Sequence, residues 1–254
     1  MAELSKSDTR DLLRDAARSL DVPTRRAFIR NVVGLGSLTL LTGCDVIDED
    51  KAEDVLRHIS QFNDRVQAWL FRPHVLAPEY TAAEITRPFP FNAFYGPADA
   101  PYVDASAYRL EVSGKVENRK SWTLPELGRL PQFTQITRHV CVEGWSAIGS
   151  WTGVRFSDFL QRVGADTTAP YVNFRCADGY FESIDMPTAL HPQTQITLRY
   201  ADETLPRIYG FPMKLRIPTK LGFKNPKHIL SMEVSDTAIG GYWSNQGYNW
   251  FSGL

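Results

Sequence analysis

The feature that most constrains this chain is a short apolar stretch, Arg138–Cys141, that ends in a cysteine. Its apolar character predicts a strand, and the glycine-rich segment that follows it, Glu143–Val154, is predicted to be a loop carrying two tryptophans. A thiol at a strand end, beside a carboxylate and an imidazole, is a candidate metal ligand because a thiolate is a soft donor. A free cysteine is also commonly a small buried hydrophobic residue. Taken alone, the stretch leaves both interpretations open.

Size and charge limit the classes of protein to which the chain can belong. With 254 residues, 43% of them hydrophobic, it is long enough for one large domain with a substantial core. Its formal net charge is −1, so no basic field indicates a nucleic-acid partner. We therefore predict a globular protein that does not bind nucleic acid.

The N-terminal segment has the order of parts found in bacterial export signals. Thr24–Arg30 contains paired arginines followed by apolar residues, as in twin-arginine signals. The apolar run Val32–Leu41 is much shorter than the ~20 residues that span a bilayer, as is typical of a signal peptide. Leu41–Cys44 resembles a lipobox, with cleavage before Cys44 and a diacylglyceryl thioether on its sulfur. The alternative is a short buried helix with an ordinary cysteine.

These parts predict where the mature chain resides. Residues 1–43 are interpreted as a twin-arginine lipoprotein signal peptide, with Cys44 as the lipid anchor. Asp45 resembles the signal that keeps some lipoproteins on the inner membrane. The expected location is the periplasmic side of the bacterial inner membrane, and the twin-arginine route suits a cofactor inserted before export.

The segment 44–75 is predicted to be a helical linker. Its apolar residues recur at helical spacing and are Val55, Ile59, Phe62, Val66, Trp69 and Leu70. Such a helix either packs on the body of the protein or spaces it from the membrane. The prolines between residues 73 and 101 then predict an extended, irregular segment.

The remainder of the chain predicts more strands than helices. The predicted strands are Tyr108–Val116, Tyr171–Cys176, Gly179–Ile184 and Gln195–Tyr200. Short helices are predicted after the N-cap Thr123, with Pro125 and Glu126 in the first turn, at Phe156–Leu160, and after Thr188 as N-cap. Short turns between strands favour an α+β protein with mixed or antiparallel sheets and short flanking helices.

Several motifs resemble one enzyme family. Cys141–Ser146, followed by Trp151–Val154, is similar to the cofactor-cysteine loop of the sulfite-oxidase family of molybdenum enzymes, and within it to the bacterial periplasmic methionine-sulfoxide reductases. The other matching segments are Phe91–Gly96, Leu205–Pro218, Thr219–Ile229 and Gly241–Trp250. The resemblance covers roughly residues 90–250. It implies the sulfite-oxidase-like molybdopterin-binding fold, with a catalytic domain over 76–254.

The resemblance also implies a cofactor and its contacts. One molybdenum-molybdopterin per chain is expected, with Cys141 as the protein ligand to the metal. The cofactor contacts carried over by position are Asn92, Tyr95, Gly96, Cys176, Tyr209, Lys214, Asn225, Pro226 and Lys227. Three of these depart from the reductase pattern: Cys176 replaces threonine, Tyr209 replaces asparagine, and Lys214 replaces an arginine whose bidentate fork a lysine cannot reproduce.

Catalytic roles follow from the same loop. Glu143 lies two residues after Cys141 and, in a strand-like geometry, would point the same way and relay protons. Trp243 or Tyr242 would form an aromatic wall above the metal. Lys224 and Lys227 offer charge for the cofactor's phosphate.

The expected reaction is oxygen-atom or two-electron transfer at molybdenum, with reduction of an S- or N-oxide such as methionine sulfoxide favoured. Glu143 would repel dianionic sulfite, and the Cys-x-Gly-Asn-Arg-Arg run of true sulfite oxidases is missing. Electrons would come from a membrane or c-type haem protein, since the chain has no Cys-x-x-Cys-His and is expected to hold no haem. The alternatives are a sulfite dehydrogenase and a non-catalytic envelope lipoprotein with a Cys141–Cys176 disulfide.

Overall fold

The computed structural model describes residues 49–254, with side chains from Glu53 onward. The chain divides into two compact units, Met1–Leu56 and Arg57–Leu254. Of the first unit only the beginning of helix α3, Glu49–Leu70, is described. The predicted signal segment 1–43 and Cys44 lie outside the described residues. Among the helices that are described, none is both long and apolar enough to cross a bilayer.

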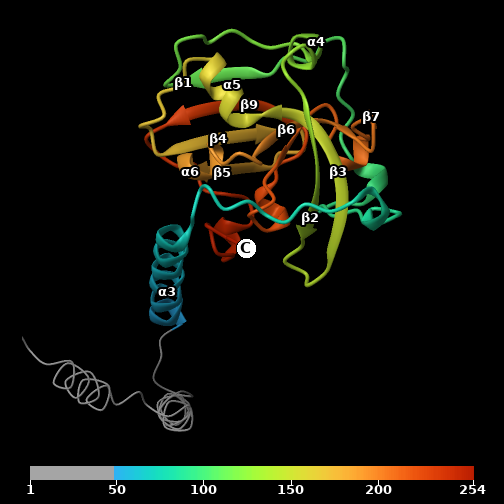
Figure 1. Ribbon diagram of the computed structural model, residues 1–254. Helices are drawn as coiled ribbons and strands as arrows, with labels where there is room; N and C mark the ends of the chain where they lie inside the picture. The colour runs from blue at the N-terminus through green and yellow to red at the C-terminus, as the bar shows by residue number, and fades with distance from the viewer. Residues whose placement is uncertain (1–48) are drawn as a thin grey trace, which may run out of the picture. The chain divides into compact units, whose positions relative to one another are not determined.

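Two sheets form the frame of the second unit (Figure 1). One has the order β1-β9-β4-β5, from β1 (Glu111–Gly114), β9 (Ile229–Ser235), β4 (Tyr171–Cys176) and β5 (Phe181–Asp185). The other contains β2 (Phe133–Val140), β3 (Ser146–Arg155), β6 (Gln195–Tyr200), β7 (Glu203–Thr204) and β8 (Lys214–Arg216). Only β1 and β9 pair in parallel among these strands, so the predicted mixed or antiparallel sheets are confirmed.

The core lies between the sheets and is closed by short helices. Its buried side chains come from both sheets, for example Val154 and Ile196 from one and Val172 and Met232 from the other. Helix α5 (Phe156–Arg162) buries Phe156, Phe159 and Leu160 against them. Removing such apolar side chains from water is the main force that holds the layers together.

The remaining helices are short. Helix α4 (Leu124–Gly128) has the predicted capping box, in which Thr123 Oγ1 accepts from the Glu126 amide at 3.3 Å. Single 3₁₀ turns cover Ala82–Glu84, Pro97–Asp99, Arg207–Tyr209, Gly222–Lys224 and Ser244–Gln246.

The predicted N-cap at Thr188 is wrong. Helix α6 (Met186–Ala189) begins one turn earlier, and its cap is Asp185. The Asp185 carboxylate accepts from the Thr188 amide at 3.3 Å and from its hydroxyl at 2.5 Å. Asp185 and Thr188, three residues apart, are both of good capping type, and the Asp185 carboxylate occupies the cap.

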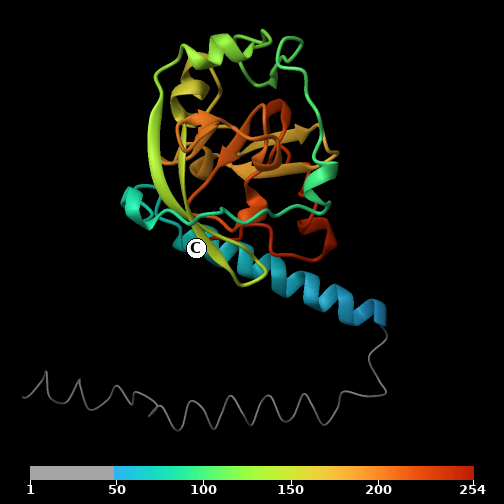
Figure 2. The same ribbon diagram turned by 90° about the vertical axis from the view of Figure 1, so that its right-hand side faces the viewer.

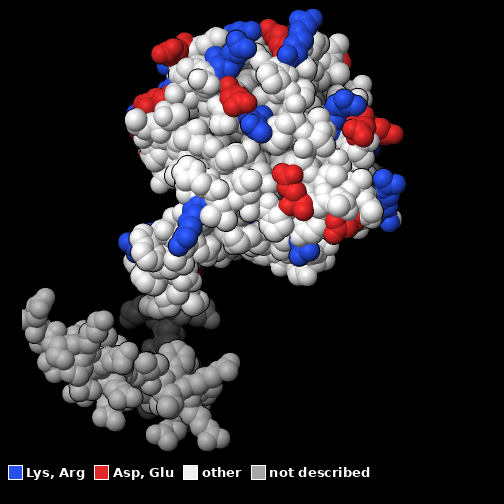
Figure 3. Space-filling view, in the orientation of Figure 1, with Lys and Arg blue, Asp and Glu red and all other residues white. Residues whose placement is uncertain are grey.

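The β2–β3 hairpin curves along one side of the domain in both ribbon views (Figure 1 and Figure 2). Its eight paired positions run from Phe133–Gly153 to Val140–Ser146. On the face shown in Figure 3, Lys and Arg are interspersed with Asp and Glu and form no large basic patch. The distribution agrees with the near-neutral charge of the chain.

Helix α3 is present where the spacing predicted it, but most of its apolar residues are exposed. Ile59 is 51%, Phe62 59% and Trp69 82% exposed. The polar side makes the contacts instead: Asp64 Oδ1 accepts from the Phe251 amide at 2.6 Å, and Gln67 Oε1 accepts from the Gly253 amide at 3.0 Å.

The buried side chain of Lys220 forms a hydrogen bond to the C-terminal segment. Its side chain is 1% exposed, and its Nζ donates to the Phe251 carbonyl at 2.9 Å. Burial lowers the pKa of Lys220 to about 7, and the Asp185 carboxylate, 3.8 Å away, offsets this only in part. An unfolded lysine has a pKa of about 10.4.

We expect this difference to appear in the pH dependence of stability. Between about pH 7 and 10 the unfolded chain holds the proton of Lys220 more tightly than the folded chain, so the free energy of unfolding rises with pH. Below pH 7 both states are protonated and the penalty is constant. Lys220→Met should lower this slope by up to about 1.4 kcal/mol per pH unit in urea titrations. Lys115→Met, at an exposed lysine whose pKa Asp236 raises, is the control, and equal slopes for Lys220→Met and wild type would contradict the assignment.

Candidate active site

The hairpin turn positions Cys141 directly after β2. The Cys141 amide donates to the Trp145 carbonyl at 2.9 Å, and the Gly144 amide donates to the Cys141 carbonyl at 3.1 Å. The predicted glycine-rich loop is therefore wrong beyond this turn, because residues 146–155 form strand β3. Two glycines in β3 made the segment resemble a loop, although the strand is held between β2 and β6.

Gly144 makes this turn possible. Its φ of +92° lies in the region that side chains with a Cβ rarely adopt, and a Cβ there would meet nothing within 4 Å. Gly144→Ala should therefore cost about 1 kcal/mol of stability through backbone strain alone. Gly128→Ala, where space is also open and φ is not positive, should be neutral or slightly stabilising. Denaturant unfolding of both variants tests this, and an equal response would show that strain does not set the turn.

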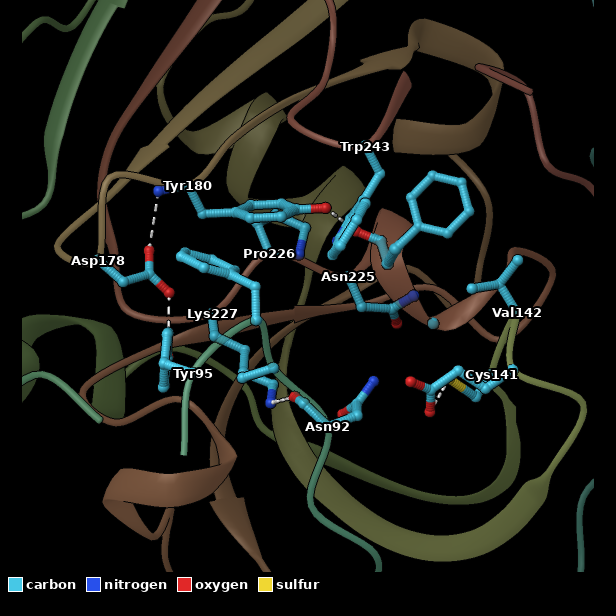
Figure 4. Close-up of a pocket in the computed structure, with 15 residues that line it drawn as sticks. Asn92, Tyr95, Cys141, Val142, Asp178, Tyr180, Asn225, Pro226, Lys227 and Trp243 are labelled. Carbon is cyan, nitrogen blue, oxygen red and sulfur yellow. Dashed lines mark hydrogen bonds between the residues drawn. The ribbon is translucent and has the colours of Figure 1, made fainter. Parts of the chain in front are cut away.

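A pocket opens beside Cys141 (Figure 4). Its empty volume is about 630 Å³, a figure that includes the open solvent at its mouth. In Figure 4 the side chains of Asn92, Asn225 and Cys141 converge on one space. The lining residues are Asn92, Ala93, Phe94, Tyr95, Cys141, Val142, Glu143, Asp178, Tyr180, Gly222, Phe223, Asn225, Pro226, Lys227 and Trp243.

Cys141 and Glu143 form a fixed pair at the edge of this pocket. The Cys141 Sγ lies 3.6 Å from Glu143 Oε2, which also accepts from Trp145 Nε1 at 2.9 Å. Burial, and then the Glu143 carboxylate, raise the pKa of the Cys141 thiol. The free side chain is thus a thiol that donates to the carboxylate, and a bound metal ion would have to displace its proton.

The opposite wall comes from three loops. Tyr95 Oη donates to Asp178 Oδ2 at 3.1 Å, and the Tyr180 amide donates to Asp178 Oδ1 at 3.0 Å. Lys227 Nζ donates to the Asn92 carbonyl. Phe94 stacks on Tyr242 with ring centroids 4.7 Å apart, which gives the mouth an aromatic rim.

Behind the pocket lies a group of cations that we call the basic cluster: Lys214, Arg216 and Lys227, with His139 beside them. Lys214 and Arg216 are 1% and 0% exposed. Burial lowers the pKa of Lys214 well below its ordinary value, and Lys227 and Arg216 lower it further. Among the ion pairs found within the described residues, none includes a member of this cluster.

His139 lies at the centre of these charges. Burial lowers its pKa well below 6.5, as do Lys214, Arg216 and Lys227, so the imidazole is neutral. Within the described residues, its Nδ1 and the Nε of Arg216 are buried without a hydrogen-bond partner. Burying charges and polar atoms without partners costs free energy of folding. We therefore interpret the basic cluster as a binding site for an anion.

Lys224 does not belong to the basic cluster, although the sequence predicts that it offers charge to the cofactor's phosphate. Its Nζ donates to Glu182 Oε1 at 2.6 Å and to the Ser183 carbonyl at 2.8 Å. Both side chains of this ion pair are buried. Lys224 therefore neutralises a carboxylate of β5 and is not available to a ligand.

The structure brings most, but not all, of the predicted site residues to the pocket. Cys141, Glu143, Trp243, Asn92, Tyr95, Asn225, Pro226 and Lys227 line it. Lys214 lies behind it, in the basic cluster. Gly96 and Cys176 adjoin it in sequence through Tyr95 and the Asp178 turn, and Cys176 is buried at the end of β4. The alternative disulfide is absent from the described part of the chain, where Cys141 and Cys176 are both free.

Tyr209 lies apart from the pocket. Its Oη donates to the Phe89 carbonyl at 2.8 Å, and its ring packs on Phe89 and Tyr200. His191 contacts a neighbouring loop, with its Nε2 3.1 Å from the Val75 carbonyl oxygen.

Asp178, Tyr180 and Arg216 were not predicted as site residues from the sequence. Asp178 and Tyr180 follow β4 and carried no motif. Arg216 stands between Leu215 and Ile217, and a charge inside an apolar strand is a usable signal because arginine is seldom buried unpaired. His139 shares a strand face with Cys141, two residues away, which the alternation of side chains in a strand predicts.

Comparison with known proteins identifies the family. Residues 97–243 match the model of the oxidoreductase molybdopterin binding domain. The chain belongs to this family. Its sulfite-oxidase-like resemblance is thereby confirmed, and the protein is a molybdopterin-dependent oxidoreductase.

Three relatives show which members of the family this chain resembles. A protein of Azospira oryzae, named "Putative protein-methionine-sulfoxide reductase subunit YedZ1", is 57% identical over 244 residues, or 96% of this chain and 93% of its own. The protein-methionine-sulfoxide reductase catalytic subunit MsrP of Burkholderia mallei is 30% identical over 56% of this chain. MsrP of Ralstonia nicotianae is 29% identical over 66%. The aligned part spans 48% and 59% of those two MsrP chains.

A solved structure supports the fold. The sulfane dehydrogenase SoxCD from Paracoccus pantotrophus superposes with a TM-score of 0.52 over 55% of this chain and 41% of that chain. The sequence identity is 20%, so this likeness concerns the family fold alone.

The residues present fit the family's cofactor. A molybdopterin carries a phosphate, and the basic cluster offers that anion positive charge, because none of its members forms an ion pair among those found within the described residues. The pocket adds the Cys141 thiol, a soft ligand, and aromatic walls. In this arrangement Lys214, Arg216 and Lys227 would hold the phosphate, Asn92 and Asn225 would contact the pterin, and Cys141 would face the metal.

Proposed function

We propose that this chain is an exported, lipid-anchored reductase of S-oxides, with methionine sulfoxide as its substrate and Cys141 as the protein ligand to molybdenum. The two kinds of relative named as methionine-sulfoxide reductases support the substrate class. Cys44 would carry the lipid, with residues 1–43 removed as the signal, 44–75 serving as linker and 76–254 as the catalytic domain. The site of action would be the periplasmic side of the inner membrane.

The observation that carries the choice of substrate is the charge of the pocket. Its charged lining residues are two carboxylates, Glu143 and Asp178, and one lysine, Lys227. No arginine of the described chain is among the lining residues. A pocket of this charge disfavours a dianion such as sulfite and accepts a neutral sulfoxide, because unpaired like charges repel at short range.

The aromatic rim suits the product as well as the substrate. Trp243 and Phe223 line the pocket, and Phe94 with Tyr180 continues the wall. Aromatic faces contact a thioether sulfur favourably.

Each residue of the pair has a separate task. When bound, a molybdopterin cofactor supplies the two-electron transfer that turns a sulfoxide and two protons into a thioether and water. Cys141 would hold the metal, and Glu143, whose carboxylate accepts from Trp145 Nε1, would pass protons to the same space. Electrons would come from a membrane or c-type haem protein.

Steady-state assays of natively exported protein test the substrate. Reduced viologen dye should be oxidised in the presence of methionine sulfoxide, free or within a peptide, and sulfite should not reduce cytochrome c or ferricyanide. Glu143→Gln should lower kcat by about 10²-fold while the molybdenum content stays unchanged. Sulfite oxidation without sulfoxide reduction would overturn the proposal in favour of a sulfite dehydrogenase.

A further inference from the structure

Helix α3 carries an apolar surface that the domain covers only in part: Val66, at its centre, is half-buried, and the apolar residues around it are exposed. Ile59, Phe62, Trp69 and Leu70 recur at spacings of three, seven and one residues, which places them on one side of a helix with 3.6 residues per turn. They are 51%, 59%, 82% and 61% exposed. We call these four residues the apolar stripe. Exposed apolar side chains gathered in this way mark a binding surface.

The contacts of α3 show which way the stripe faces. The Asp64 and Gln67 side chains accept from the Phe251 and Gly253 amides. With 3.6 residues per turn, Asp64 lies opposite the middle of the stripe and Gln67 lies between Asp64 and the edge of the stripe at Leu70. The polar side of α3 thus packs on the end of the chain. The stripe faces away from the domain.

The sequence before α3 indicates what the stripe meets. Cys44, the residue proposed to carry a lipid, precedes the start of α3 at Glu49 by five residues. Five residues reach at most ~18 Å, so a lipid at Cys44 keeps the start of the helix close to a bilayer surface. Amphipathic helices with Trp, Phe and Leu on the apolar side lie in the plane of that interface.

We propose that the apolar stripe of α3 lies in the interface of the lipid bilayer and fixes the orientation of the catalytic domain on the membrane. This inference rests on the lipid anchor of the proposed function. One acyl-bearing residue tethers a domain without orienting it, whereas a helix buried along one side sets both its distance and its tilt. The domain would then present one constant side to a membrane-bound electron donor.

A second copy of the chain is a less favourable partner for the apolar stripe than a bilayer. Four side chains on one helix can bury a few hundred Å² per copy at most, since large aromatic residues bury ~150–250 Å² each. A stable interface needs about 800 Å² per partner. Contact with a bilayer does not require so large a buried area, because the lipid on Cys44 would already hold the chain at the membrane.

Nitroxide accessibility on the full, natively exported chain tests the proposal. Trp69→Cys is labelled and bound to vesicles of phosphatidylethanolamine and phosphatidylglycerol. Tyr102→Cys, at an aromatic residue that is 84% exposed, is the matched control. The label at position 69 should become accessible to oxygen and at least fivefold less accessible to a water-soluble nickel chelate, while the control should not change. Equal accessibility at both positions would overturn the proposal. It would also be overturned if the protection of position 69 from the chelate disappeared when protein was diluted at constant lipid, because that result indicates a second copy.

A second measurement separates the stripe from the anchor. Mass spectrometry reports whether Cys44 carries a diacylglyceryl group, and sulfoxide reduction is assayed independently. In the unlipidated Cys44→Ala chain, flotation with the same vesicles should persist weakly and fall at least tenfold in Phe62→Asp, but not in Tyr102→Asp. If Cys44 carries no lipid yet flotation depends on Phe62, the anchor fails and the stripe stands. If flotation is absent or ignores Phe62, the stripe fails whatever the state of Cys44.

Discussion

Cys141→Ser should abolish sulfoxide reduction, with a loss on the order of 10³-fold or more. A serine hydroxyl stays protonated and is a hard donor, so it cannot replace the thiolate that molybdenum requires. Folding should be nearly unaffected, because the two side chains are close in size and the hairpin is held by the backbone bonds of Cys141. Dye-linked reduction of methionine sulfoxide and a thermal melt give the two readouts.

The control for this variant is Ser146→Ala, in the same hairpin. Ser146 is exposed and begins β3, so its activity should remain within about twofold of wild type, as for most surface substitutions. Activity of Cys141→Ser within threefold of wild type would refute the assignment of Cys141 as the metal ligand. A loss of both activity and thermal stability would instead show a structural role for the thiol.

Lys214→Met should have opposite effects on the cofactor-free and the loaded protein. Without the cofactor, Lys214 is a buried ammonium whose pKa burial, Lys227 and Arg216 all lower. Replacing such a charge by an apolar chain of similar volume should stabilise the cofactor-free chain by about 1–3 kcal/mol. Its melting temperature should rise by several degrees, roughly 2–4 °C per kcal/mol at this size.

In the loaded protein the same substitution removes a partner of the phosphate. A charge-assisted contact in a buried site is lost, so pterin content after purification should fall at least ~10-fold. Lys115→Met, at an exposed lysine paired with Asp236, should change neither quantity. A destabilised cofactor-free chain with normal pterin content would mean that Lys214 serves packing against Trp151, over whose ring it lies at 4.6 Å, and not the anion.

Local patterns predicted the elements whose signals lie within a few residues. The capping box at Thr123 and Glu126 formed as expected, because both partners belong to one turn. Strands β4 and β6 alternate or carry apolar runs and were predicted with their observed bounds. The cysteine motif also located the pocket.

The errors share a physical cause, which is that long-range contacts override local preference. Gly153 reads as a loop residue, yet a Cβ there would lie 1.9 Å from the Ile196 carbonyl oxygen, so β3 needs glycine in order to approach β6. Lys224 lies in a motif that resembles a phosphate-binding one, but it forms an ion pair with Glu182, 42 residues earlier in the chain. The burial of Lys214 and Arg216 has no local signal beyond their apolar neighbours.

The assignments above require that this chain bind a molybdopterin through Cys141 and the basic cluster. Metal and pterin analysis of natively exported protein tests it most directly, for wild type and for Cys141→Ser. We expect one molybdenum and one pterin per wild-type chain, with the molybdenum spectrum altered or lost in the variant. Wild-type protein that contains neither molybdenum nor pterin would contradict it and favour an envelope lipoprotein that keeps the fold without the chemistry.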